Sequence, residues 1–219
     1  MAKAKKRATR ATGVKKTWFL ILAPKLFNSQ VVGETLVAEP SKSIGKLVPV
    51  NLTSLTGDMR RQNIQIIFKI DNATGSKFYT EIVGYEMLAS SLKRLVRRGK
   101  NKIDYSFTAS TAEGNKVRIK VIMITRGMTK LSSLTGLRKA CEENVKRILS
   151  QMNYGNLVDD VIHHNIQSNL KKLLNKIYPL KICEIRYMRL LKKGKKPEKA
   201  VKKEAPKKIA KQKEVKKSA

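Results

Sequence analysis

Residues 63–83 read NIQIIFKIDNATGSKFYTEIV, and this stretch decides the expected fold class. Asn63–Ile70 is rich in isoleucine and is followed by Asp71-Asn72-Ala73-Thr74-Gly75, which is a strong turn signal. The strand pattern resumes at Lys77–Val83. Two strand-like runs on either side of a turn predict a hairpin with a longer loop.

Further strands are expected on both sides of this hairpin. Glu113-Gly114-Asn115 predicts a turn, so the two runs that flank it should form a second hairpin. Pro49 favours a sheet edge, because proline cannot donate a hydrogen bond to a ladder. The additional strands are expected at Gly33–Glu39, Lys46–Leu52, Ile103–Ala109, Lys116–Thr125 and Ile182–Leu191.

Three helices are expected where apolar residues recur at helical spacing. The first covers about Tyr85–Arg98, and Gly99 is its natural stop. The second carries an apolar stripe from Leu134 to Met152, and the third runs from about Asn156 to the break at Tyr178-Pro179. Strands followed mainly by helices predict an α+β fold, with an antiparallel sheet that could curl into a barrel and with packed helices.

The chain is strongly basic, and its charge divides it into three parts. Its 219 residues include 48 Lys+Arg and 16 Asp+Glu, for a formal net charge of +32. We expect a basic disordered arm at 1–16, a globular α+β RNA-binding domain at 17–191 and a Lys/Ala/Pro-rich disordered tail at 192–219. Such a charge implies a polyanionic partner, with nucleic acid preferred over a membrane surface. No run approaches the roughly 20 apolar residues of a membrane span, so a soluble intracellular protein is expected.

One segment concentrates cations without acids. Lys93, Arg94, Arg97, Arg98, Lys100 and Lys102 lie within ten residues. On the expected helix, pairs four residues apart would repel each other, which favours an external anion such as an RNA phosphate over a merely solvated face. Further RNA contacts are expected at Lys15, Lys16, Arg60, Arg61, Arg126, Lys130, Arg138 and Lys139.

Two other basic stretches are interpreted differently. Lys116, Arg118 and Lys120 alternate with apolar residues, so they should share one strand face. For this row, phosphate contact and ordinary solvent exposure are equally favoured. Lys146 and Arg147 follow Glu142 and Glu143 by four positions, and this favourable order indicates local neutralisation.

Catalytic and metal-binding patterns are weak, so neither an enzyme nor a cofactor is expected. His163 and His164 follow Asp159 and Asp160 by four positions, which favours local Asp–His contacts over a metal site because no cysteine lies nearby. Cys141 lies on an apolar stripe and should belong to the core. Trp18 is expected to be a packing anchor rather than a platform for base stacking.

Five stretches in the same order resemble the archaeal and eukaryotic small-subunit ribosomal protein family S-three-A-e (e-S-one in the unified naming). They are Trp18 with Ala23, Pro24 and Phe27; Gly33 with Thr35, Leu36 and Val37; Leu95–Arg98; Ile177–Leu180; and Ile185, Arg186, Arg189 and Leu191–Lys193. Ile82 departs from the phenylalanine of many members, and the stretch 129–139 varies between its Thr and its Arg-Lys.

This resemblance implies a structural constituent of the small ribosomal subunit, located in the cytoplasm. Its partners would be small-subunit ribosomal RNA, neighbouring ribosomal proteins and translation initiation machinery, on the platform near the messenger exit. The alternative from composition is a basic DNA-binding protein of the chromatin type. A factor that only visits the ribosome is a third hypothesis, and an enzyme that uses His163 or His164 is the weakest.

Overall fold

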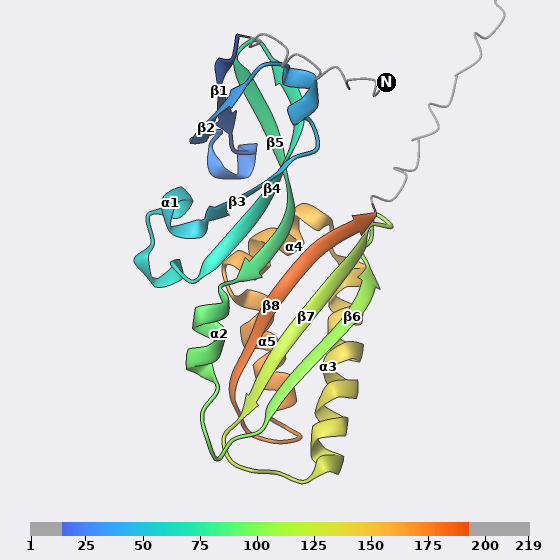
Figure 1. Cartoon of the computed structure of the whole chain (residues 1–219). Coiled ribbons are helices and arrows are strands. Elements are labelled where there is room, and N and C mark those ends of the chain that lie inside the picture. The colour runs from blue at the N-terminus through green and yellow to red at the C-terminus, as the bar shows by residue number, and fades with distance from the viewer. Residues whose placement is uncertain (1–14, 193–219) are drawn as a thin grey trace, which may run out of the picture.

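The computed structural model describes residues 15–192 (Figure 1), so the expected arms at 1–16 and 192–219 lie outside the described residues except for residues 15, 16 and 192. Short 3-10 helices occur at Lys25–Phe27, Pro40–Ser43 and Met59–Arg61. The strands and α-helices in chain order are β1 (Thr17–Leu22), β2 (Val31–Val37), β3 (Leu47–Asn51), α1 (Leu52–Thr56), β4 (Ile64–Thr74), β5 (Lys77–Met87), α2 (Ala89–Leu95), β6 (Lys102–Ser110), β7 (Lys116–Thr125), α3 (Leu131–Gln151), α4 (Tyr154–Ile162), α5 (Asn165–Leu174) and β8 (Leu180–Lys192).

The eight described strands form one branched sheet, which confirms the α+β fold class. The order is β2-β1-β5-β8-β7-β6, and β4 lies between β5 and β3. One edge of β5 is divided, because Lys77–Tyr79 pair with β1 and Gly84–Glu86 pair with β8. The pairing of β1 with β5 is parallel, whereas the sheet was expected to be antiparallel throughout. The barrel that the sequence left open does not form, because this branching separates the two halves of the sheet instead of joining its ends.

The central hairpin is confirmed, but its loop is shorter than expected. β4 continues through Thr74, and Gly75 with φ of 59° makes the tight turn. The register shifts between Ile70 and Asn72, so Asp71 forms a bulge in the strand instead of the loop that its sequence favoured. β5 also runs on to Met87, where a helix was expected. α2 therefore covers only Ala89–Leu95.

The remaining predicted strands are confirmed within a few residues at their ends. Pro49 lies in β3, which pairs only with β4 and is therefore an edge strand. β1 was not among the predicted strands. The third predicted helix was wrong as a continuous element, since it divides into α4 and α5 at His164, which has a left-handed φ of 60°.

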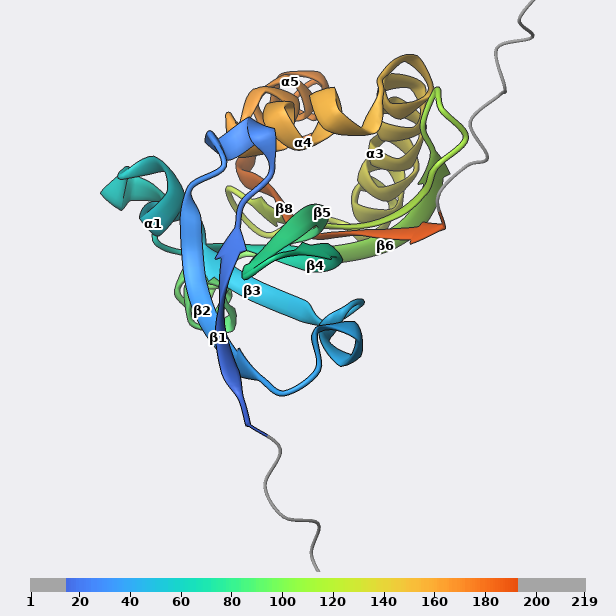
Figure 2. The same cartoon turned by 90° about the horizontal axis from the view of Figure 1, so that it is seen from above.

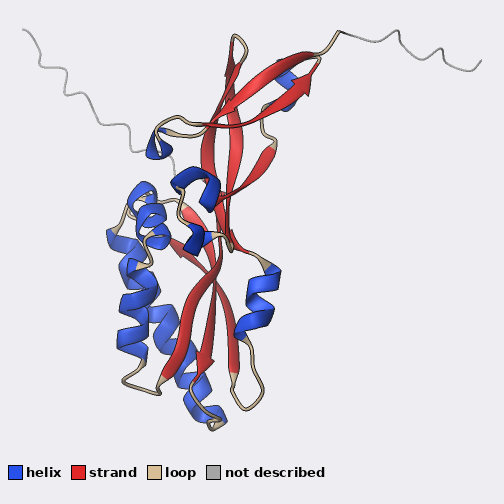
Figure 3. Ribbon diagram, turned by 90° about the vertical axis from the view of Figure 1, so that its left-hand side faces the viewer, coloured by secondary structure: helices blue, strands red, loops and turns tan. Residues whose placement is uncertain are grey.

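The helices lie on two sides of the lower part of the sheet. Figure 2 shows α3, α4 and α5 as a layer over one face, and Figure 3 shows the short α2 on the opposite side. The main core lies between the α3–α5 layer and the sheet and includes Leu137, Val145 and Ile119, all fully buried. A smaller cluster lies in the upper part, where the rings of Phe19 and Phe78 stack with centroids 4.8 Å apart. No helix in residues 15–192 is long and apolar enough to cross a membrane.

Both thiols should be inert in the folded protein. Cys141 and Cys183 are buried, which confirms the core position expected for Cys141. Burial raises the pKa of Cys141 to about 12 and also raises the pKa of Cys183, so almost no thiolate exists at neutral pH. We expect no alkylation by iodoacetamide at pH 8 in buffer and two modified thiols in denaturant, measured by mass spectrometry. Rapid modification of the native chain would contradict this burial.

Trp18 is not a packing anchor, and the sequence-based prediction was wrong. Its side chain is 64% exposed, because it points away from the Phe19 and Ile21 side of β1. We expect Trp18→Ala to change the free energy of unfolding by less than about 0.5 kcal/mol, as is usual for exposed positions. Urea unfolding would measure this, and a loss of about 3 kcal/mol, typical of a buried tryptophan, would contradict the exposed position.

Candidate nucleic-acid interface

Three loops that are distant in sequence meet at the lower end of the molecule in Figure 1. They connect α2 to β6, β7 to α3, and α5 to β8. The backbone N–H of Asn101 donates to Thr125 Oγ1 at 2.9 Å, and the N–H of Arg126 donates to the Pro179 carbonyl at 3.1 Å. These hydrogen bonds fix the three loops relative to one another.

Four cations gather here, three on these loops and one at the start of β8, and we call them the basal cluster: Arg97, Lys100, Arg126 and Lys181. Contact with the ammonium of Lys181, followed by desolvation and the charges of Lys181, Arg97 and Arg126, lowers the pKa of Lys100. None of the four forms an ion pair with a carboxylate within residues 15–192. Positive charge that is not neutralised locally attracts anions.

Stability should rise at alkaline pH because of this repulsion. The pKa of Lys100 is lowered in the folded state, so the unfolded chain binds more protons and stability increases with pH. The destabilisation is fully present below the folded pKa and is lost as pH approaches the ordinary lysine value of 10.5. We expect Lys181→Gln to stabilise the protein at pH 7 and to flatten this rise. Urea unfolding from pH 7 to pH 10.5 would test both effects, and a steeper rise in the variant would contradict them.

The structure brings two predicted basic segments to this end. Lys93 and Arg94 are exposed on α2, and Lys130 is the exposed residue before α3. Arg138 and Lys139 lie about two turns further along α3. Arg97 and Arg98 follow the end of α2, so the predicted helical repulsion with Lys93 and Arg94 was wrong. Lys181 is the one residue of the basal cluster that was not predicted. Its only signal in the sequence was its position two residues after Pro179, where the predicted helix ends.

Other predicted cations are separate from the basal cluster or are already paired. Lys15 and Lys16 precede β1 at the opposite end of the fold (Figure 1). Arg60 and Arg61 lie in the short helix beyond α1, where Arg61 pairs with Asp58 at 3.2 Å. Lys102 is exposed but pairs with Asp104 at 2.6 Å.

The comparison with known families agrees with the resemblance seen in the sequence. A model described as the Ribosomal S3Ae family matches residues 4–194. The chain belongs to this family. The proteins it resembles include three named small ribosomal subunit protein eS1. The first, from Methanothermobacter thermautotrophicus, is 31% identical over 191 residues, which are 87% of this chain and 98% of that protein.

Two other eS1 proteins show the same extent of similarity to this S3Ae-family chain. The protein from Halorubrum lacusprofundi is 30% identical over 184 residues, covering 84% of this chain and 86% of the relative. The protein from Saccharolobus islandicus is 30% identical over 177 residues, covering 81% and 85%. The similarity therefore extends across the whole described fold.

The α3 surface of this S3Ae-family chain is neutralised locally, as the sequence predicted for Lys146. Its ammonium lies 2.6 Å from Glu142, and this contact, with a further hydrogen bond from the Tyr105 hydroxyl, lowers the pKa of Glu142. Arg147 instead donates to the Asn144 side-chain oxygen at 3.2 Å. This helix face therefore offers less free charge than the basal cluster.

The two histidines do not form the expected symmetrical Asp–His pairs. His164 Nδ1 lies 3.3 Å from Glu184, and Asp160 instead accepts a hydrogen bond from Asn165. His163 remains near Asp159, whose pKa is raised mainly by burial and lowered in part by that histidine. No group of three or more His, Cys, Asp or Glu side chains within residues 15–192 could hold a metal ion.

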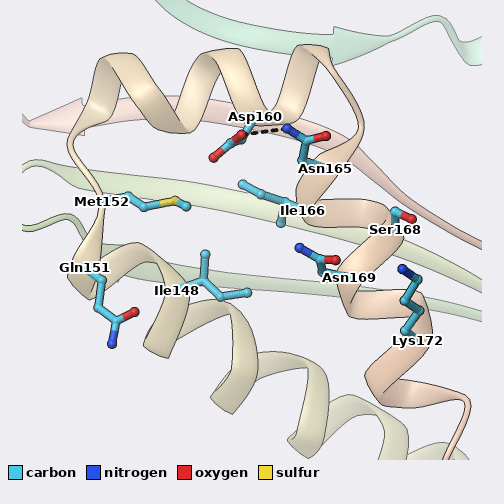
Figure 4. Close-up of a pocket in the computed structure, with 9 residues that line it drawn as sticks. All are labelled: Ile148, Gln151, Met152, Asp160, Asn165, Ile166, Ser168, Asn169 and Lys172. Atoms are coloured by element: carbon cyan, nitrogen blue, oxygen red, sulfur yellow. Dashed lines mark hydrogen bonds between the residues drawn. The ribbon is translucent and has the colours of Figure 1, made fainter.

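A polar hollow of about 670 Å³ lies between α3 and α5 (Figure 4). Asn165 donates to Asp160 at 2.9 Å on one side of it, and Lys172 lies at the other end. The rest of the lining is mainly amide and aliphatic, and it includes Gln151, Ile148 and Asn169. These residues do not combine a nucleophile with an adjacent general base.

Proposed function

We propose that the chain is a structural constituent of the cytoplasmic small ribosomal subunit that binds ribosomal RNA through the basal cluster. The observation that carries this proposal is the convergence of four cations, from two loops and the start of β8, without a carboxylate ion-pair partner among the described residues. The family supports it, because the relatives are named as small-subunit proteins.

The mechanism is charge neutralisation on a rigid support. Each arginine or lysine that reaches a phosphate releases condensed counterions, which supplies affinity without reading sequence. The hydrogen bonds between the loops hold the cations in a fixed pattern, so the shape of the RNA can be selected. Catalysis is not part of this role.

We extend the proposal to the arms and the partners. Residues 17–191 would be the RNA-binding unit, with the basic arms at 1–16 and 192–219 adding phosphate contacts. Neighbouring ribosomal proteins and the initiation machinery would contact surfaces that the RNA leaves free.

Sedimentation of a cell extract through sucrose gradients at moderate and high salt tests the proposal. We expect the chain to move with small subunits in constant ratio through the salt wash. Migration with DNA would support the chromatin alternative instead. Release to the top of the gradient in high salt would indicate a visiting factor, and either result would overturn the proposal.

A further inference from the structure

Figure 3 shows that the side of the sheet away from α3 and α5 is the side on which α2 lies. The strand pattern places a second basic surface on this side. Alternation along β6, β7 and β8 places the apolar residues under the helices and the polar residues outward. We call this outward surface the open face. Its members are Ser106, Thr108, Ser110, Lys116, Arg118, Lys120, Tyr187 and Arg189.

The strand register sets these side chains in rows. Arg118 lies opposite Thr108 on one side and opposite Arg189 on the other. In the next row Lys120 lies opposite Ser106 and Tyr187, and its ammonium sits 4.8 Å from the Tyr187 ring centre. Hydroxyl groups, cations and one aromatic ring are therefore held side by side on one face of the sheet.

The cations of the open face lack local neutralisation. Arg118 and Arg189 face each other directly, and like charges in this position destabilise a sheet. Neither has an ion-pair partner within the described part of the chain. The nearby carboxylate of Asp104 is already shared between Lys102 at 2.6 Å and Arg186 at 3.8 Å. Glu86, beside Tyr187, is the other acid at the border of this surface.

We infer that the open face is a second RNA-binding site, which takes the phosphate backbone of a different RNA segment from the one at the basal cluster. This inference rests on the proposed function and extends it. Arg118 and Arg189 would bind phosphates, and the hydroxyls of Ser106 and Thr108 would donate to phosphate or ribose oxygens. A protein partner fits less well, because the centres of protein interfaces are depleted of charge.

The two sites lie too far apart for one phosphate group to reach both. Arg118 is near the start of β7, whereas Arg126 follows its end. At about 3.3 Å per residue, eight residues of strand separate them by roughly 26 Å. The loss of one site should therefore leave RNA contacts at the other.

Directed cleavage locates the RNA at this surface. An iron chelate attached to Thr108→Cys would generate hydroxyl radicals at the open face, and the same chelate on Glu143→Cys would probe the exposed side of α3. The native cysteines are buried, so labelling is confined to the new thiol. In assembled small subunits we expect strong ribosomal RNA cleavage from position 108 at sites distinct from those near the basal cluster. Strong cleavage from position 143 with none from position 108 would overturn the inference.

A binding measurement separates this inference from the proposed function. Arg118→Gln with Arg189→Gln should reduce the salt slope of binding to small-subunit ribosomal RNA by about 1.5. The control, Lys42→Gln with Lys146→Gln, removes the same charge from lysines already paired with Glu39 and Glu142 and should change the slope less. Equal slopes for the two double variants, with native RNA binding retained, would overturn the open face alone. Absence of specific RNA binding by the native chain would overturn the proposed function.

Discussion

Neutralising the basal cluster should reduce affinity for small-subunit ribosomal RNA by about three orders of magnitude at 0.1 M salt. The variant changes Arg97, Lys100, Arg126 and Lys181 to glutamine. Each lost phosphate contact removes about 0.7 to 0.9 from the slope of log affinity against log salt, so four contacts remove about three. The deficit should therefore shrink toward zero near 1 M salt. A filter-binding titration from 0.05 to 1 M salt would measure both quantities.

The control for this variant removes equal charge from cations that already have carboxylate partners. Lys42, Arg61, Lys102 and Lys146 each form an ion pair in the folded chain. Their change to glutamine should weaken RNA binding much less. The basal variant should also be more stable than the native chain, because repulsion with Lys100 is removed. An equal effect of the two quadruple variants would show that only net charge matters and would contradict a defined basal site.

Met188→Ala should lower the free energy of unfolding by about 3 kcal/mol. Met188 is fully buried at the middle of β8, opposite Ile119 of β7 and Tyr85 of β5. Truncation would open a cavity where β8 joins the two parts of the sheet. The lost energy is a large fraction of the stability of a typical domain. Urea unfolding should show a lower midpoint with an unchanged slope.

Leu191→Ala is the matched control for this prediction. It lies three residues along the same strand, but its side chain is 43% exposed. We expect a change below about 1 kcal/mol. A similar loss for both substitutions would indicate that strand propensity, rather than packing at the junction, determines the effect.

The fold class and most strands could be predicted from sequence, because their periodicity is local. The alternation around Val117 and Ile119 and the turn at Gly114 each depend on neighbours within a few residues. The end of β5 could not be predicted in this way. Tyr85 fits a helical stripe because it lies three residues before Leu88, but the pairing of Tyr85 with Ile66 and of Met87 with Ile64 holds this segment in the sheet.

The site was predictable only as separate basic segments. The density of cations around Arg97 was visible in the sequence, whereas the approach of Lys181 depends on α5 bringing the chain back to the same end, where β8 begins. The row of Arg118 could be assigned to one strand face, but its meeting with Arg189 depends on register between strands. Sequence spacing gives the position of a charge along an element and not which distant element lies beside it.

The branching of the sheet at β5 also determines the order in which its strands can pair while the chain is being synthesised. β8 is the last described element, yet it supplies the neighbour of both β5 and β7. Until residues 180–192 leave the translating ribosome, one edge of β7 and the end of β5 have no strand beside them. Such unpaired edges favour association with other chains. The newly made protein therefore cannot complete its sheet before residue 192 has emerged, and until then the repulsion between its positive charges opposes such association.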